Sequence, residues 1–185
     1  MFAFLMPRIP ETIKFLFFFY LFFNVFSSIS QTNEDVPLNN IAINEIPKPI
    51  SSLIFEDFSG NEINLKHYHG RLVIINFWAT WCAPCKKEMP SLDNLYQDNN
   101  FKNLQIFAVN MEQPNALKTK KFFTDLNIQK LEIFFDPNLN FVKEFKLRGM
   151  PTTVLINKKG EEFARITGET NFQNKKFVKW LSKYD

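Results

Sequence analysis

FWATWCAPCKKE, at residues 77–88, is the stretch of this 185-residue sequence that decides the fold, and it holds the only two cysteines, Cys82 and Cys85. Apolar residues precede the pair and good helix formers follow it, so we expect both cysteines at the start of a helix. Backbone N–H groups and the positive end of the helix dipole favour a thiolate there. Cys82 is therefore the expected attacking sulfur. Cys85, one turn further into the helix, is expected to be less exposed.

A Cys-x-x-Cys pair can also be a plain stabilising bridge or half of a zinc site. A bridge that closes a loop of four residues constrains little of the unfolded chain, and a zinc site needs further ligands that the sequence does not offer. The only histidines, His67 and His69, lie where a solvent-facing loop is expected rather than a ligand set. We expect no metal and no cofactor. Since the chain has no other cysteine, any disulfide chemistry must involve a partner's sulfur, which indicates a dithiol exchanger.

Strand and helix patterns alternate on both sides of this stretch. Residues 72–77, LVIINF, form a nearly continuous apolar run, typical of a strand buried on both faces of a sheet. Residues 53–65 predict two short strands around a turn. The other expected elements are helices at 83–96, 115–126, 138–145 and 171–184, and strands at 105–110, 133–135, 153–156 and 163–167. This order predicts an α/β fold, with a central mixed β-sheet flanked by helices and an extra N-terminal β-hairpin.

The N-terminal residues differ in composition from the rest of the chain. Nine of the 23 phenylalanines lie before residue 27, most of them in the run FLFFFYLFFNVF at 15–26. Arg8 and Lys14 precede this run, which gives residues 1–30 the charge and length of a secretory signal peptide. A spanning helix needs about 20 apolar residues. An uncleaved membrane anchor is therefore the second alternative.

The remaining chain is predicted to divide at about residue 52. Residues 31–51 are rich in Asn and Pro and show no sustained period, so we predict a linker there, followed by one domain at 52–185. The 22 basic and 19 acidic residues give a net charge of +3 and are spread without blocks. This balance argues against nucleic acid as a partner.

GMPTT, at residues 149–153, is the second motif of the domain. Together with FWATWCAPCKKE it resembles the thioredoxin superfamily, and more narrowly its TlpA/ResA-type branch of membrane-tethered or periplasmic thiol-disulfide oxidoreductases. The resemblance covers about 52–185 and implies a thioredoxin-like fold. It also implies a cis peptide at Met150–Pro151 that faces the dithiol, where the backbone of residue 150 pairs with an extended substrate segment. The residues alone indicate only a proline at a strand start, because about 5% of such bonds are cis.

Two positions depart from ordinary thioredoxin. Asn76 stands where thioredoxins carry a buried aspartate, and Ala108 stands where they carry its lysine partner. In the TlpA/ResA branch a glutamate lies near the dithiol, and Glu88 matches it, one helical turn beyond Cys85. Our hypothesis is that Glu88, partly desolvated and so raised in pKa, takes the proton from Cys85 when Cys85 resolves the mixed disulfide. The alternative is a solvated helix glutamate that follows two lysines.

Aromatic and proline residues around the dithiol have separate expected roles. Trp81 is expected to be a partly exposed platform beside the attacking cysteine, whereas Trp78 is expected to be a packing residue. Pro84 lacks an N–H and fixes its own backbone turn, so it should influence the redox potential. The expected substrate-binding residues are Trp81, Pro84, Met150 and Pro151.

The resemblance implies a reductant of disulfides in exported proteins, such as apocytochrome c or oxidase assembly factors. It places the protein in the periplasm, soluble or tethered to the inner membrane by an uncleaved N-terminal segment. Because that compartment is oxidising, the dithiol needs a membrane thiol electron donor as a second partner. Two alternatives stay open: an oxidant that donates its disulfide, and a non-redox protein-binding module that uses the groove around Pro151.

Overall fold

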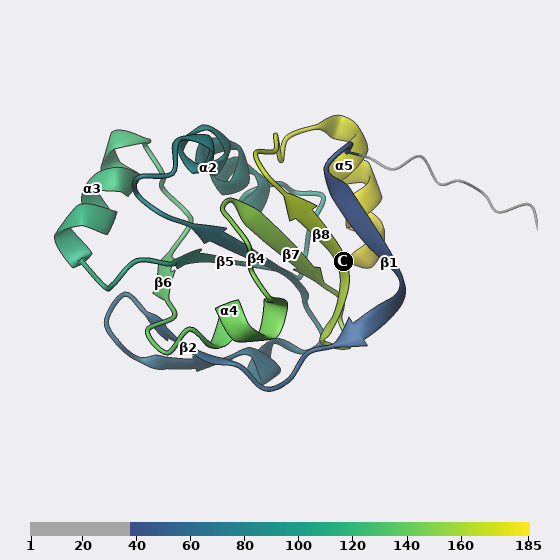
Figure 1. Ribbon diagram of the computed structural model, residues 1–185. Helices are drawn as coiled ribbons and strands as arrows, with labels where there is room; N and C mark the ends of the chain where they lie inside the picture. The colour runs from purple at the N-terminus through teal and green to yellow at the C-terminus, as the bar shows by residue number, and fades with distance from the viewer. Residues whose placement is uncertain (1–37) are drawn as a thin grey trace, which may run out of the picture. The chain divides into compact units, whose positions relative to one another are not determined.

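A computed structural model describes residues 38–185, which form one eight-stranded sheet with helices on both faces (Figure 1). The strands are β1 (Ile41–Pro49), β2 (Ile54–Asp57), β3 (Glu62–Asn64), β4 (Leu72–Trp78), β5 (Leu104–Asn110), β6 (Ile133–Phe135), β7 (Thr152–Ile156) and β8 (Glu161–Thr167). The helices are α2 (Ala83–Tyr96), α3 (Ala116–Asp125), α4 (Asn140–Phe145) and α5 (Lys175–Leu181). The strand order is β1-β8-β7-β4-β5-β6-β2-β3. The predicted α/β class with a central mixed sheet is confirmed.

The predicted signal peptide or membrane anchor at 1–30 lies outside the described residues. Within residues 38–185, no helix combines the length and hydropathy that crossing a membrane requires.

Strand β4 lies at the centre of the sheet, and all seven of its residues are buried. It pairs in parallel with β5 and antiparallel with β7. Successive side chains of a strand point to opposite faces of the sheet. Ile74 and Trp78 therefore join the core cluster that includes residues of α2, α3 and α5, while Val73 and Phe77 join the cluster that includes residues of α4. Burial on both faces explains why this strand has no alternating polar positions.

Four residues separate the end of β4 from the start of helix α2, which has the bounds that the sequence predicts. Cys82 is its N-cap residue, and Pro84 lies in its first turn, where a missing N–H removes no helical hydrogen bond. The buried side chains include Cys85, Glu88 and Leu92, which are spaced three or four residues apart. This spacing puts the second cysteine and Glu88 on the same inward face of the helix.

The linker predicted at 31–51 is wrong for residues 41–49, because these residues form β1, which pairs antiparallel with β8. The domain therefore begins before residue 52. Prolines are tolerated at the edge of a sheet, where one side of the strand has no partner, so Pro47 and Pro49 do not exclude a strand. The pairing also shifts register between Ile43 and Lys48. That irregularity hides the two-residue period from which a strand is predicted.

The predicted N-terminal hairpin is present as β2 and β3, which pair antiparallel. It extends the sheet at the end opposite β1, because β2 also pairs antiparallel with β6. Asp57 holds the connecting turn, since its Oδ1 accepts hydrogen bonds from the backbone N–H groups of Ser59 and Asn61. Strand β4 leads to the dithiol, and two strands, β5 and β6, separate β4 from the hairpin. The hairpin therefore extends the sheet at a distance from the dithiol.

Candidate redox site

The two cysteines form a disulfide at the start of α2, with an S–S distance of 2.02 Å and Cα atoms 5.3 Å apart. Cys82 is 3% exposed and Cys85 is fully buried. The backbone N–H of Cys85 donates to the Sγ of Cys82 over 3.2 Å, so the N-cap sulfur receives a hydrogen bond from the first turn of the helix. Such donors stabilise negative charge, which is the environment expected for the attacking sulfur.

The loop around Pro151 lies beside this helix start. The Met150–Pro151 peptide is cis, as the resemblance implies. Thr152, the next residue, pairs with Phe77 near the end of β4, and β4 leads directly to the dithiol. Met150 packs against the core cluster that contains both cysteines. The structure therefore brings the two sequence motifs together where β4 ends and β7 begins.

The tryptophans divide as expected between surface and core. Trp81 is 68% exposed, which makes it an accessible ring next to Cys82. Trp78 is fully buried and packs against Phe122 and Phe123, with ring centroids 4.5 Å and 5.4 Å away. Trp78 thus packs the end of β4 into the core, whereas the ring of Trp81 lies at the surface.

Glu88 is buried, with 1% of its surface exposed, so the alternative of a solvated helix glutamate is wrong. Its Oε1 accepts a hydrogen bond from the side-chain N–H of Asn76 over 2.8 Å, and its Oε2 accepts one from the backbone N–H of Thr170 over 3.1 Å. Burial raises the pKa of Glu88 to about 7, although both hydrogen bonds act in the opposite direction and the charge of Glu169 adds to the rise. A carboxyl group with this pKa can gain or release a proton near neutral pH.

Asn76 connects Glu88 to the sheet. In the register of β4, it lies between Ala108 of β5 and Thr153 of β7. Its side-chain nitrogen donates both to Glu88 and to the Oγ1 of Thr153, the latter over 2.9 Å. Neither Asn76 nor Ala108 can ionise. Glu88 is therefore the side chain in this network that can ionise.

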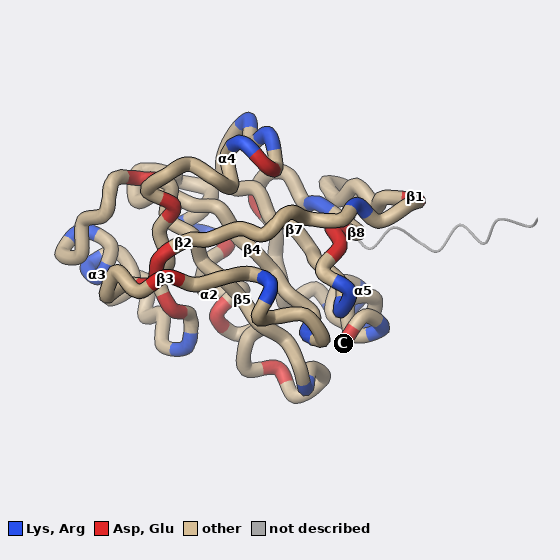
Figure 2. Tube along the Cα trace, turned by 90° about the horizontal axis from the view of Figure 1, so that it is seen from below, with Lys and Arg blue, Asp and Glu red and all other residues tan. Residues whose placement is uncertain are grey.

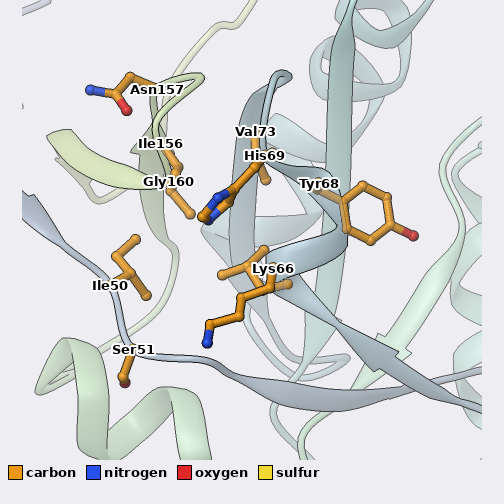
Figure 3. A pocket seen from close by; sticks show the side chains of 10 residues that line it. Ile50, Ser51, Lys66, Tyr68, His69, Val73, Ile156, Asn157 and Gly160 are labelled. Atoms are coloured by element: carbon orange, nitrogen blue, oxygen red, sulfur yellow. The ribbon is translucent and has the colours of Figure 1, made fainter.

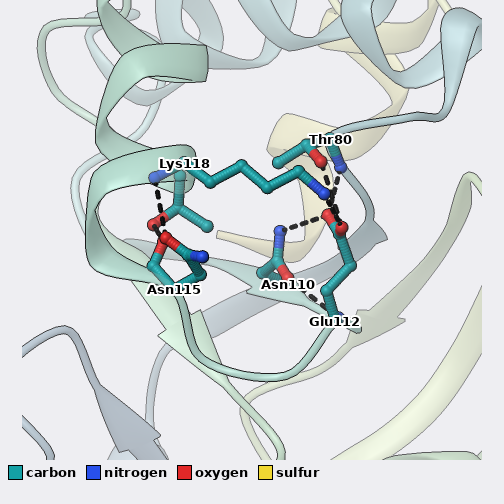
Figure 4. Close-up of polar contacts among 6 residues, drawn as sticks. Thr80, Asn110, Glu112, Asn115 and Lys118 are labelled. Carbon is teal, nitrogen blue, oxygen red and sulfur yellow. Dashed lines mark hydrogen bonds and ion pairs between the residues drawn. The ribbon is translucent and has the colours of Figure 1, made fainter.

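Glu112 is a site residue that the sequence reasoning missed (Figure 4). Its carboxylate accepts hydrogen bonds from both the backbone N–H and the hydroxyl of Thr80, two residues before Cys82. Asn110 and Lys118 donate to the same carboxylate, so the end of β5 and helix α3 are tied to the loop before the dithiol. Burial alone raises the pKa of Glu112, but the hydrogen bonds from Lys118 and Thr80 outweigh it and lower the pKa below its ordinary value.

One signal for Glu112 is present in the sequence. Strands β4 and β5 are parallel, so the residues that follow them meet at the same edge of the sheet. An acidic residue two positions after the predicted strand at 105–110 therefore lies near the residues that follow 72–77. The individual hydrogen bonds to Thr80, however, depend on the side-chain geometry of the folded loop.

Neither histidine belongs to this site. His67 and His69 are both exposed, as expected. They precede β4, while the dithiol follows it, and a strand of seven residues is about 23 Å long. The ring of His69 points toward Gly160 (Figure 3) and lines a cavity of about 10 Å³, the smallest size that could hold one water molecule.

Comparison with known proteins shows the family of this chain. The family model for the AhpC/TSA family matches residues 46–161. The chain is 36% identical over 117 residues to the thiol-disulfide oxidoreductase ResA of Halalkalibacterium halodurans, an alignment that covers 63% of this chain and 65% of that protein. It is 32% identical over 139 residues to ResA of Bacillus thuringiensis, covering 75% and 79%. For the first relative, the matched part is slightly less than two thirds of its length.

Solved structures show the same fold. A secreted thiol-disulfide isomerase from Corynebacterium glutamicum superimposes with a TM-score of 0.66 at 18% sequence identity, over 78% of this chain and 92% of that one. At this identity the likeness concerns the fold, which agrees with the thioredoxin-like arrangement of strands and helices around the dithiol.

Proposed function

Because this chain belongs to the AhpC/TSA family, among its thioredoxin-like, ResA-type thiol-disulfide oxidoreductases, we propose that it reduces disulfides of exported proteins. The observation that carries this proposal is the buried carboxyl group of Glu88, with a pKa of about 7, on the same inward helix face as the fully buried Cys85. A reductase needs a proton acceptor there, because its second cysteine must become a thiolate before it can release the product.

The proposed reaction starts from the reduced protein. The thiolate of Cys82 attacks one sulfur of the substrate disulfide, and the other substrate sulfur leaves as a thiolate. The result is a mixed disulfide between Cys82 and the substrate. Its formation is supported by the N-cap position of Cys82, where the first turn of α2 favours negative charge on sulfur, and by the exposed ring of Trp81 beside it.

Cys85 then resolves the mixed disulfide. In this proposal the carboxylate of Glu88 takes the proton from the Cys85 thiol, and the resulting thiolate attacks the Sγ of Cys82. The second substrate sulfur leaves as a thiolate, which completes a transfer of two electrons to the substrate. The protein keeps the Cys82–Cys85 disulfide, which is the state that the structure contains. A membrane thiol electron donor then restores the dithiol.

The proposal includes an extracytoplasmic location and substrates such as apocytochrome c or oxidase assembly factors. Its support is the signal-like composition of residues 1–30, outside the described part of the chain, and the secreted protein among the structural neighbours. In the proposal, Trp81, Pro84, Met150 and Pro151 contact the substrate. Pro84 is half-buried beside the exposed Trp81, and Pro151 lies at the same sheet edge.

Equilibration with glutathione tests the direction of electron flow. We expect a redox potential well below about −200 mV, the scale set by glutathione. A value far above that scale would instead make the protein an oxidant that donates its disulfide.

A trapping experiment tests whether the dithiol is the working part. The Cys85→Ala variant should accumulate mixed disulfides between Cys82 and its substrates, because the resolving thiol is missing. The matched control is the double variant Cys82→Ala/Cys85→Ala, which should capture none and should lose function. Full function of the double variant would show that the protein is a non-redox binding module.

A further inference from the structure

A cleft of about 500 Å³ lies next to the loop around Pro151. Its walls come from β1, from β8, from the end of α4 and from the chain that leads from there into β7. Gly149 and Thr152, which flank the Met150–Pro151 peptide, are both part of the lining, and the hydroxyl of Thr152 donates to the carbonyl oxygen of Gly149 over 2.8 Å. The cleft is thus continuous with the loop that lies beside the dithiol.

Four basic and two acidic side chains line this cleft, and both acidic ones already have partners. Glu162 binds Arg165 through two hydrogen bonds, of 2.8 Å and 2.9 Å. Glu144 accepts a hydrogen bond of 2.6 Å from the hydroxyl of Ser51. Arg165 thus neutralises the charge of Glu162, whereas Glu144 keeps its negative charge because a serine hydroxyl is neutral.

The other three basic residues, Lys48, Lys146 and Arg148, are exposed, and none of their side chains has an ion pair or hydrogen bond among residues 38–185. They come from separate segments, β1 and the chain after α4. In Figure 2 basic residues lie around α4 and beside β1 and β8. Because the lining holds four basic and two acidic side chains, its net charge is +2.

The walls of the cleft are held in place by Arg165. Besides its ion pair with Glu162, Arg165 donates a hydrogen bond of 2.6 Å to the backbone carbonyl oxygen of Phe145, the last residue of α4. The next residue, Lys146, has a positive φ of 50°, a left-handed conformation that usually favours glycine or asparagine. The backbone N–H of Lys146 caps α4 by donating to the carbonyl oxygen of Val142, while its side chain has no hydrogen bond or ion pair within residues 38–185.

From these observations we propose that the cleft binds an acidic segment of the substrate polypeptide, a few residues away from the disulfide to be reduced. This inference rests on the proposed function and adds the substrate class. A substrate strand that pairs with the backbone of Met150 passes either Gly149 or Thr152. Three further residues of extended chain cover about 10 Å, which extends the substrate from Gly149 or Thr152 along the lining of the cleft. Complementary charge of this kind raises association rates and discriminates between partners.

The test compares three peptides that carry the same intramolecular disulfide. Their flanking residues are acidic in the first, neutral in the second and basic in the third. The reduced full chain is mixed with each, and the second-order rate constant of peptide reduction is measured at low ionic strength. We expect the acidic peptide to react about tenfold faster than the neutral one, with the basic peptide slowest, and we expect added salt to shrink the difference.

Charge-reversal variants then test whether the basic residues of the cleft cause the preference for the acidic peptide. The variant Lys146→Glu/Arg148→Glu should lose or invert the preference, and Lys48→Glu, on a different element, should reduce it. The matched control is Lys175→Glu/Lys176→Glu on α5, which changes the net charge equally with exposed residues outside the cleft lining and should keep the preference. Within each variant, the rate for the acidic peptide is divided by the rate for the neutral peptide. A general effect of the substitution on the dithiol changes both rates and cancels in this ratio.

The outcomes separate this proposal from the proposed function. If no peptide is reduced, the reductase proposal fails, whereas equal reduction of all three peptides overturns only the acidic-segment proposal. An acidic preference that survives charge reversal of the cleft also overturns it. Vesicles with and without anionic lipid provide the last measurement. If charge reversal weakens vesicle binding but leaves peptide selectivity unchanged, the cleft faces a membrane and the proposal is wrong.

Discussion

The side-chain amide of Asn76 donates a hydrogen bond of 2.8 Å to the carboxyl group of Glu88, and both residues are buried beneath the redox helix. The bond joins the central strand of the sheet to the inward face of α2. It stabilises the ionised form of Glu88, while burial favours the protonated form. The balance leaves the pKa of Glu88 at about 7, so this carboxyl group can change its charge under physiological conditions.

The stability of the oxidised protein should therefore depend on pH through Glu88. Its pKa rises from 4.5 to about 7 on folding, so the folded state holds the proton more tightly than the unfolded state. The resulting stabilisation is complete below about pH 4.5 and is lost as the pH rises through 7. Over that window the free energy of unfolding should fall by about 3 kcal/mol relative to a protein without this group.

Urea unfolding of the wild type and of Glu88→Gln at a series of pH values measures this contribution. In the variant, the free energy of unfolding should lack the decline assigned to Glu88. The difference in unfolding free energy between the two proteins should therefore change steadily between pH 4.5 and 7. Parallel pH profiles for the two proteins would mean that Glu88 does not titrate in this range. Glu169→Gln, which removes an exposed neighbouring carboxylate, is the matched control and should keep the decline.

The resolving step should be slow without Glu88. A mixed disulfide between Cys82 and a chromophoric small thiol is resolved when Cys85 attacks, and release of the chromophore gives the rate. In Glu88→Gln we expect a rate about 100-fold lower, the usual contribution of a positioned general base. The thiol pKa of Cys85 should also change, because its coupled partner is gone. A Cys85 titration that is the same in both proteins would remove Glu88 from the mechanism.

Glu112 should keep the loop before the dithiol closed. Glu112→Ala leaves the backbone N–H and hydroxyl of Thr80 without their acceptor, which should cost about 1–3 kcal/mol of unfolding free energy. The lowered pKa of Glu112 means that this stabilisation is present at neutral pH and is lost as the pH falls through the folded-state pKa. Hydrogen exchange at the Thr80 amide should be faster in the variant.

Lys118→Ala is the control for Glu112, because it removes one half-exposed donor and leaves the bonds to Thr80 in place. This substitution should lower the free energy of unfolding by at most about 1 kcal/mol, the usual contribution of an exposed ion pair. If the lysine variant opens the loop as much as Glu112→Ala, the carboxylate acts only through its ion pair.

Gly160 should tolerate no side chain. It has a φ of +80°, and a Cβ atom there lies 2.3 Å from the Nε2 of His69 (Figure 3). Gly60 has almost the same φ, +82°, but has open space around the same position. We expect Gly60→Ala to lower the free energy of unfolding by about 1–2 kcal/mol through backbone strain alone. Gly160→Ala should lower it further, because the new methyl group also meets the His69 ring. Equal losses in thermal or urea unfolding would show that the His69 ring moves aside freely.

Local patterns in the sequence were sufficient for the dithiol and for most of the sheet. The cysteine pair lies between an apolar strand and a helix, and the strand–helix order follows from residues that are neighbours along the chain. The edge strand β1 was missed, because its prolines and its register shift remove the alternating pattern. The cis peptide at Met150–Pro151 followed only from the resemblance, since most such bonds are trans.

By itself the sequence determined where the chemistry lies, because the only two cysteines of the chain stand three residues apart at a predicted helix start. Only the tertiary structure decided the surroundings of that chemistry. Thr170, which donates to Glu88, is 82 residues away along the chain, and Glu112 is 32 residues from Thr80. Burial and such distant hydrogen bonds set the pKa of a carboxyl group. They arise when separate elements pack together, and no local pattern encodes them.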